Sequence, residues 1–193
     1  MPTRLPTLRK TPRAQAPRGE AELVVDGEHF RRIVVEGICA AKVSVDIATA
    51  DFKAMLVPTG GSRRAESIVA VFRRLARAGV EIRLLHAGVP SSAALLELRR
   101  ELPENLTIRR CPRLHAKTVV IDARQMYLGS ANLTGAGLGA KADGRRNIEW
   151  GVWTQSAEMI EAVLDEFNAL WCGAQCESCK RKDVCPVPLE EPG

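Results

Sequence analysis

The stretch HAKTVVID at residues 115–122 is the part of the sequence that decides the predicted fold. Its middle, TVVI at residues 118–121, is typical of a short buried strand. The stretch GSANLT follows at residues 129–134, so the two together read H-x-K-x4-D-x6-G-S-x-N. Because side chains alternate along a strand, His115 and Lys117 share one face and Asp122 points to the other.

The residues around this motif alternate between helical and strand patterns. Hydrophobic periodicity predicts helices at residues 27–41, 64–78, 91–102 and 157–171. Strands are predicted at residues 42–49, 80–86, 106–110, 117–122, 125–129 and 147–154, with a turn at residues 58–61. Gly79 is the expected stop of the second helix. This alternation indicates an α/β fold in which helices cover a sheet.

The residue types of the motif suit attack on a phosphodiester. The imidazole of His115 is a competent nucleophile near neutral pH. Lys117 and Asn132 are expected to hold the non-bridging oxygens, and Glu149 to accept a hydrogen bond from the far ring nitrogen of His115. Ser130 lies where it could reach the same pocket. Asp122 is expected to organise structure without touching the substrate.

The spacing of these residues resembles the HKD motif of the phospholipase D superfamily. The resemblance extends over roughly residues 27–171, and AGVEIR at residues 78–83 and NIE at residues 147–149 are part of it. It implies a mixed sheet flanked by helices on both faces. It also implies a phosphodiester hydrolase with a phosphohistidine intermediate at His115, and no metal for the hydrolysis itself.

A second histidine is needed to protonate the leaving oxygen, and in the superfamily it comes from another copy of the motif. The sequence has three histidines, and neither His29 nor His86 is followed by a lysine two residues on. Family members with a single motif act as pairs of chains. We therefore expect a homodimer in which His115 of a second subunit completes the site.

The cysteines are clustered near the end of the chain. Four of them form the pattern C-x3-C-x2-C-x5-C at Cys172, Cys176, Cys179 and Cys185. The pattern resembles the [4Fe–4S] loops of helix-hairpin-helix DNA glycosylases, although the first spacer is shorter here. It predicts a [4Fe–4S] cluster with a structural role, with zinc as the alternative. The two isolated cysteines, Cys39 and Cys111, are expected to be buried thiols.

Charge is concentrated at the start of the chain. The net charge of +5 equals the five basic residues among residues 1–19, which include no acid, so the rest of the chain is formally neutral. We expect a disordered basic tail at residues 1–20, a phospholipase D-like catalytic domain at residues 21–171 and a metal-binding segment at residues 172–193. Without an apolar run that could span a bilayer or an export signal, a cytoplasmic location is expected.

Further basic side chains are expected to grip the phosphates of a nucleic acid. They stand just before the motif and in the Gly-rich loop that precedes Glu149: Arg109, Arg110, Arg113, Lys141, Arg145 and Arg146. The sequence thus predicts a nuclease that acts on DNA or RNA. Two alternatives stay open, a nucleic-acid-binding module with little turnover and a phospholipase or phosphatidyl transferase.

Overall fold

A mixed sheet forms the centre of the protein in the computed structural model, which describes residues 21–58, 65–100 and 102–185. Its seven strands lie in the order β1-β9-β8-β7-β2-β5-β6. The strands span Glu22–Val25 (β1), Ser44–Thr49 (β2), Glu81–His86 (β5), Leu106–Arg110 (β6), Thr118–Ile121 (β7), Gln125–Gly129 (β8) and Trp150–Thr154 (β9). Strands β2, β5 and β6 are parallel, whereas β7, β8, β9 and β1 pair in antiparallel fashion. The predicted mixed sheet is confirmed.

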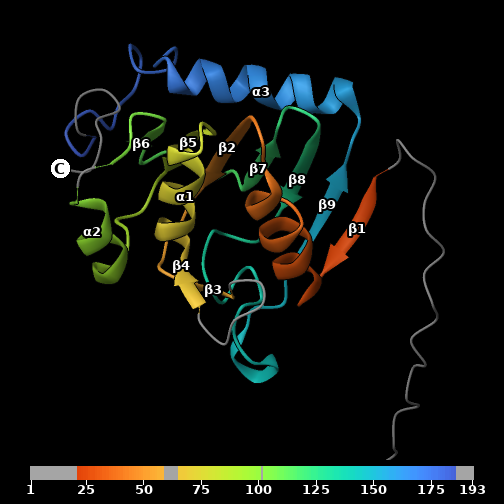
Figure 1. The fold of residues 1–193 in the computed structure, drawn as a ribbon. Coiled ribbons are helices and arrows are strands. Elements are labelled where there is room, and N and C mark those ends of the chain that lie inside the picture. The colour runs from red at the N-terminus through yellow and green to blue at the C-terminus, as the bar shows by residue number, and fades with distance from the viewer. Residues whose placement is uncertain (1–20, 59–64, 101, 186–193) are drawn as a thin grey trace, which may run out of the picture.

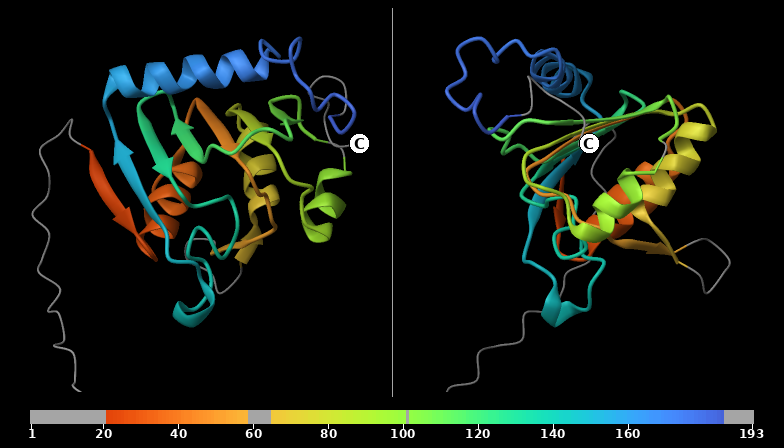
Figure 2. Two further views of the ribbon diagram at one scale, coloured as in Figure 1. Left: turned by 180° about the vertical axis from the view of Figure 1, so that it is seen from behind. Right: turned by 90° about the vertical axis from the view of Figure 1, so that its left-hand side faces the viewer.

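Helices cover both faces of this sheet, as predicted (Figures 1 and 2). One face carries η1 (Phe30–Val35), η2 (Ile38–Ala40), α1 (Ile68–Arg77) and α2 (Ser92–Leu98), and the other carries α3 (Ala157–Trp171). The larger apolar core lies under η1 and α1, and includes Val45, Ile47 and Val119 from the sheet. Alternate residues of the same strands, such as Val120 and Met126, pack under α3 with Ile160.

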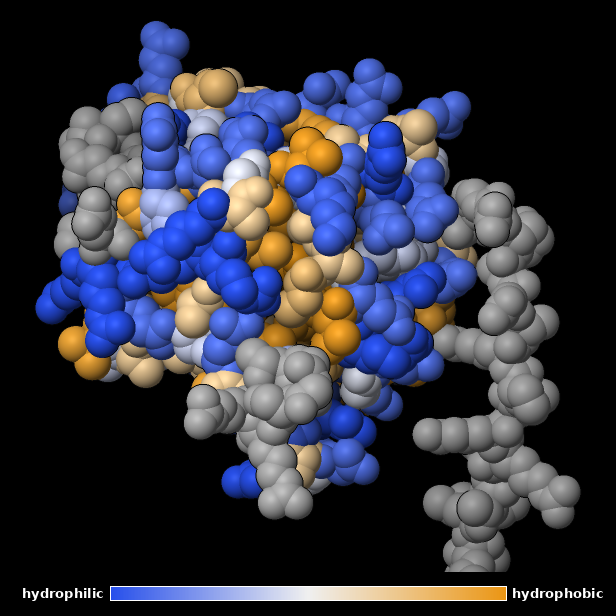
Figure 3. All heavy atoms as spheres, in the orientation of Figure 1, coloured by the Kyte–Doolittle hydropathy of each residue, from blue (hydrophilic) through white to orange (hydrophobic). Residues whose placement is uncertain are grey.

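Hydrophilic side chains cover much of the face that carries η1 and α1, with apolar surface showing between them (Figure 3). Helix α3 has the predicted bounds, and it begins where the Ser156 hydroxyl accepts a hydrogen bond from the Met159 amide at 3.3 Å. No helix in the described part of the chain combines the length and the apolar character that crossing a membrane requires.

The predicted first helix is wrong in detail. Residues 28–35 are helical, with the π form from Phe30 to Val35, and the turn is broken at Gly37 before η2 begins. A side chain at Gly37 would meet the Ile33 carbonyl oxygen at 2.6 Å and the Ile121 side chain at 2.5 Å. The segment between the two short helices therefore has no room for a side chain at this position.

The bounds of α1, α2 and β9 also differ from the predicted ones, and β2, β5 and β7 are each one or two residues shorter than predicted. Helix α1 begins four residues later than residue 64, because β3 (Leu56–Pro58) and β4 (Ala65–Ser67) pair as a two-stranded ribbon and Ser67 then caps the helix. Helix α2 ends at Leu98, short of residue 102, and β9 begins at Trp150 and not at residue 147. The predicted basic tail, the tip of the turn at residues 59–61 and the last eight residues lie outside the described residues.

Asp122 connects the turn after β7 to the start of β2. Its Oδ1 accepts hydrogen bonds from the amides of Lys42, Val43 and Ser44 at 3.1, 2.7 and 3.0 Å. Asp122 and Ala123 both have positive φ, at 52° and 50°, which is the backbone of a tight turn between antiparallel strands. This turn lies at the opposite end of β7 from His115 and Lys117.

Candidate active site

The candidate site lies at one edge of the sheet, where the parallel strands β2 and β5 end at Thr49 and His86. Strand β8 also ends at this edge, and β7 and β9 begin there, because both are antiparallel to β8. The motif residues therefore arrive on three neighbouring strands, β7, β8 and β9, although Glu149 is separated from His115 by more than thirty positions in the sequence. In open α/β sheets, ligands bind outside the carboxyl ends of the parallel strands.

His115 and Lys117 lie together just before β7. The Lys117 Nζ is 3.2 Å from Nδ1 and 3.3 Å from Nε2 of the His115 ring, and it donates a hydrogen bond to the His115 carbonyl oxygen at 2.8 Å. The histidine is exposed and the lysine is buried. Burial lowers the pKa of the Lys117 ammonium, and the Glu149 carboxylate partly opposes this effect. An exposed imidazole and a lysine ammonium group therefore lie next to each other at this edge of the sheet.

Glu149 is buried at the start of β9, and both of its oxygens are engaged. Ser130 donates its hydroxyl hydrogen to Oε2, and Asn147 donates from Nδ2 to Oε1 at 3.0 Å. The Ser130 Oγ in turn accepts from the Trp150 amide at 3.1 Å. Within the part of the chain that the structure describes, Glu149 does not form the predicted hydrogen bond with His115. Its carboxylate instead accepts hydrogen bonds from Ser130 and Asn147.

Asn132 is oriented by the end of β2. Its Oδ1 accepts from the Asp51 amide at 3.1 Å and lies 3.3 Å from the Thr49 hydroxyl, which donates mainly to the Asp51 carbonyl oxygen at 2.8 Å. The Thr49 Oγ1 also accepts from the Leu133 amide at 3.0 Å, so the loop after β8 is fixed on the end of β2. With its oxygen held by an amide hydrogen, Asn132 presents Nδ2 as a donor. Such a donor suits a phosphate oxygen.

Tyr127 supports the loop that carries Ser130 and Asn132, and the sequence analysis did not find it. Its hydroxyl accepts from the Ala131 amide at 3.1 Å and lies 3.1 Å from Nε2 of the buried His29. Since the His29 Nδ1 donates to the Asp26 carbonyl oxygen at 2.9 Å, Nε2 is the acceptor for the tyrosine proton. Burial is the main cause that raises the pKa of Tyr127 to about 12. The ring is thus a neutral, fixed support.

Two glycines make room for this tyrosine. A Cβ at Gly129 would lie 2.3 Å from the Tyr127 hydroxyl oxygen, and one at Gly151 would lie 2.2 Å from its Cε2. Gly129 and Gly151 are partners across β8 and β9. The single tyrosine of the chain stands two residues before the Gly-Ser pair, and this was the sequence signal that could have revealed the support.

Comparison with known families agrees with this arrangement. Residues 34–171, most of the chain, match the family described as "Cardiolipin synthase, PLD-like domain". The chain belongs to this PLD-like family. No curated protein matches the sequence.

Solved structures share the fold of this PLD-like domain at low sequence identity. NucT from Helicobacter pylori is 18% identical, with a TM-score of 0.57 over 77% of this chain and 93% of its own. Nuc from Salmonella typhimurium, a phospholipase D family member, is 18% identical, with a TM-score of 0.58 over 79% and 95% of the two chains. The archaeal chromatin protein TrmBL2 is 13% identical, with a TM-score of 0.50 over 78% and 51%.

The other two histidines of the PLD-like domain lie in its interior. His29 is fully buried against Tyr127, and His86 is fully buried at the end of β5, where its Nδ1 donates to the Gly88 carbonyl oxygen at 2.8 Å. Burial lowers the pKa of His86 and so favours its neutral form. His115 is therefore the single exposed imidazole of the three histidines.

Three of the six basic residues expected to grip phosphates make contacts within the domain. Arg109 donates to the Trp171 carbonyl oxygen at 2.8 Å, and Arg110 donates to the Ala87 carbonyl oxygen at 3.1 Å. Arg146 forms an ion pair with Asp143 at 2.7 Å. The remaining three, Arg113, Lys141 and Arg145, are exposed.

The cysteines of the last segment do not all face the same way. Cys176, Cys179 and Cys185 line one cavity together with Cys111, whereas Cys172 ends α3 with an exposed side chain and is not part of the lining. Cys111, predicted to be a buried isolated thiol, is half-buried and faces this cavity. In the described part of the chain, no three histidine, cysteine or acidic side chains converge at the spacing that a single metal ion needs.

Proposed function

We propose that this PLD-like domain is a phosphodiesterase that cleaves DNA or RNA as a homodimer, with no metal ion needed for the hydrolysis. The observation that carries the proposal is the exposed imidazole of His115 beside the Lys117 ammonium, at the sheet edge where Asn132 also presents a donor. A nucleophile and two donors for the phosphate oxygens at the same edge of the sheet support this proposal.

In the first step, a ring nitrogen of His115 attacks the phosphorus atom, and the bond to the leaving oxygen breaks. The Lys117 ammonium and the Asn132 amide hold the non-bridging oxygens, where negative charge increases in the transition state. The leaving oxygen takes a proton from an imidazolium across the site. In the second step, that now neutral imidazole accepts a proton from water, the water oxygen attacks the phosphorus, and the His115 nitrogen is released.

The second imidazole is proposed to be His115 of another copy of the chain, because His29 and His86 are fully buried and engaged elsewhere. Apolar side chains beside the site favour such pairing. Ile148 and Trp150, on either side of Glu149, are 84% and 67% exposed. Burying them against a second copy removes apolar area from water and places two copies of the site side by side.

The basic side chains favour nucleic acid as the substrate. Lys141 and Arg145 are exposed on the Gly-rich loop that leads to Glu149, and Arg113 is exposed two positions before His115. The chromatin protein that shares the fold is described as binding DNA. Cationic side chains at these positions can contact several phosphates of a strand passing the site.

The test is cleavage of single- and double-stranded DNA and RNA in EDTA. The wild-type chain should cleave at least one of these polymers, and His115→Ala should abolish cleavage while the fold, measured by circular dichroism, is retained. Undiminished cleavage by His115→Ala would remove this residue from the mechanism. Salt-sensitive binding without cleavage would favour a binding module, and release of head groups from lipid vesicles would favour a phospholipase.

A further inference from the structure

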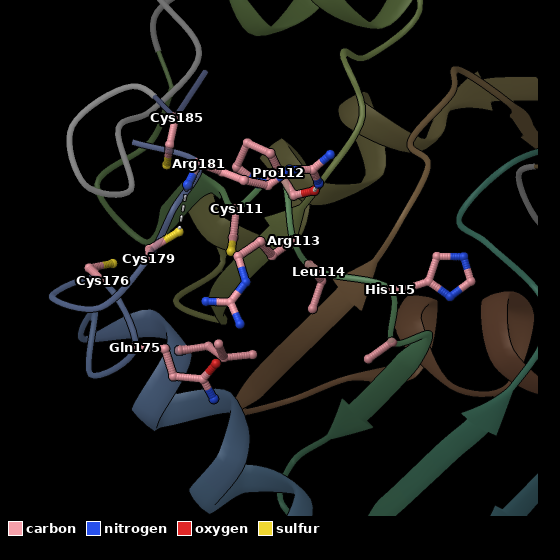
Figure 4. Close-up of a pocket in the computed structure, with 12 residues that line it drawn as sticks. Cys111, Pro112, Arg113, Leu114, His115, Gln175, Cys176, Cys179, Arg181 and Cys185 are labelled. Atoms are coloured by element: carbon pink, nitrogen blue, oxygen red, sulfur yellow. Dashed lines mark hydrogen bonds between the residues drawn. The ribbon is translucent and has the colours of Figure 1, made fainter. Parts of the chain in front are cut away.

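Four thiols from two distant segments gather around one cavity. Its volume is about 230 Å³, and its lining includes Cys111, from the turn after β6, and the three cysteines Cys176, Cys179 and Cys185. Figure 4 shows the thiols of this cysteine cavity on one side and His115 at the other end. Cys111 stands apart from the other cysteines in the sequence, so its spacing carries no metal motif.

Cys172 takes no part in the cysteine cavity. It is the C-cap residue of α3, and its amide donates to the Asn168 carbonyl oxygen at 2.9 Å, so its backbone continues the helix. Its side chain is exposed. The four cysteines that line the cavity are therefore not the four of the sequence pattern. Cys111 takes the place of Cys172.

The two segments that supply these thiols are held together by other contacts. Arg181 donates from Nη1 to the Pro112 carbonyl oxygen at 3.0 Å, and Arg109 donates to the last residue of α3, Trp171, at 2.8 Å. Cys111 and Cys176 both pack against one small apolar cluster, which contains Leu114 and Trp171. The position of Cys111 is thus defined by packing on both sides.

The charges around the cysteine cavity fit thiolates that share a metal. The Arg181 amide donates to the Cys179 Sγ at 3.4 Å, and the basic residues Arg113 and Arg181 line the cavity together with the thiols. Ionised thiols around one cavity repel one another, and neighbouring cations and a bound metal centre reduce that repulsion.

We propose that Cys111, Cys176, Cys179 and Cys185 hold a four-thiolate metal centre and that Cys172 is not a ligand. The cluster forms as the four thiols release their protons to solvent and bind ferrous and ferric iron, supplied in equal amounts together with sulfide; in the zinc alternative the same four thiolates bind one zinc ion. The geometry favours the [4Fe–4S] cluster, because the four thiols line a cavity and, in the described residues, no three of them converge at the spacing of a single ion. Its thiolates each bind a different iron and surround a volume, whereas zinc draws all four sulfurs to about 2.3 Å from one point.

The centre has a consequence for the candidate active site. Cys111 lies four residues before His115, and the turn between them is closed by a hydrogen bond from the Leu114 amide to the Cys111 carbonyl oxygen at 2.9 Å. His115 itself lines the cavity. A metal bound to Cys111 fixes this turn to the end of the chain, so Cys111 is a positioning residue for His115.

The test measures metal content in the full-length chain purified without oxygen. Wild type should hold about four iron atoms and four sulfides, with a brown absorption that dithionite bleaches, or about one zinc in a colourless protein. The matched variants are Cys111→Ser and Cys172→Ser. The first should lose the metal, and the second should keep it in full. Metal loss from Cys172→Ser with retention by Cys111→Ser overturns the proposal, and so does a wild-type protein without metal.

A second measurement uses the unmodified chain, so it does not depend on the folding of a variant. Thiol alkylation followed by mass spectrometry should label Cys172 rapidly and leave Cys111 protected until the metal is removed. Rapid labelling of Cys111 in the metal-bound protein contradicts the assignment. Amide hydrogen exchange at residues 113–117 should become faster in Cys111→Ser and stay unchanged in Cys172→Ser. Equal exchange in both variants contradicts the positioning of His115.

Discussion

The hydroxyl group of Tyr127 lies 3.1 Å from Nε2 of His29, and both side chains are buried beneath the loop that carries Ser130 and Asn132. The same hydroxyl accepts the Ala131 amide proton, so one oxygen connects the first helical turns of the chain to the candidate site. These groups have no access to water, and each depends on the other for its hydrogen bond.

Tyr127→Phe should therefore destabilise the protein by about 1–3 kcal/mol, because the His29 nitrogen and the Ala131 amide would be left buried without a partner. The measurement is urea unfolding followed by circular dichroism. Leu96→Ala, at an exposed position of α2, is the control and should stay within about 0.5 kcal/mol of wild type. A Tyr127→Phe midpoint equal to that of the control would show that the hydroxyl contributes nothing.

Gly151→Ala should be more damaging than an alanine elsewhere, because its Cβ would lie 2.2 Å from the Tyr127 ring. Displacing a packed ring costs about 1–3 kcal/mol and also shifts the loop that Tyr127 supports. Gly144→Ala is the matched control, since an added Cβ there meets no atom within 4 Å. Thermal unfolding should show a lowered midpoint for Gly151→Ala alone. Similar midpoints for the two variants would mean that the ring has room to move.

Asp122→Ala should lower stability and leave the chemistry intact. The variant loses three amide hydrogen bonds to the start of β2, and it places alanine at a φ of 52°. A loss of about 2 kcal/mol is expected, because the bonds are charge-assisted. Asp122→Asn keeps an acceptor and tolerates this backbone, so it should lose less. Specific activity per folded molecule should match wild type in both, and a selective loss of activity would place Asp122 in the chemistry.

The fold was predictable because the apolar periodicity of α3, β5, β6 and β8 agrees with their packing. The exceptions have tertiary causes. The pairing of Glu22–Val25 with Trp150–Trp153 joins residues more than a hundred positions apart, and the close approach of Gly37 to Ile121 joins residues more than eighty positions apart. Local pattern carries no information about either contact.

The site was predictable as far as the motif spacing reaches. The motif spacing predicted that His115 and Lys117 lie side by side. It did not predict the hydrogen-bond partners of the other site residues, which depend on three-dimensional packing. The Glu149 carboxylate is held by Ser130 and Asn147, and the Tyr127 support has no counterpart in the motif. Likewise, consecutive cysteines suggested Cys172, although the chain brings the distant Cys111 to the cavity.

The pH dependence of the proposed cleavage should report Lys117. The reaction needs its ammonium form, and burial lowers its pKa, so activity should fall on the alkaline side below the pKa of a free lysine. The Glu149 charge opposes that lowering. Glu149→Gln should therefore shift the alkaline limb to still lower pH in the residual activity, and Lys117→Arg should move it upward, since guanidinium stays charged. An alkaline limb that is the same in all three proteins would exclude Lys117 as its source.

Ile148→Asp should weaken the proposed homodimer at little cost to the fold, because the side chain is 84% exposed in the single chain. Burying a carboxylate at a subunit interface is strongly unfavourable, so light scattering after gel filtration should show a shift from dimer to monomer. Leu96→Asp on α2, also exposed, is the control and should remain dimeric. Cleavage should fall in parallel with the dimer fraction and recover at high protein concentration. An Ile148→Asp protein that is monomeric and fully active would show that one imidazole is enough, and the second subunit would then have no part in the reaction.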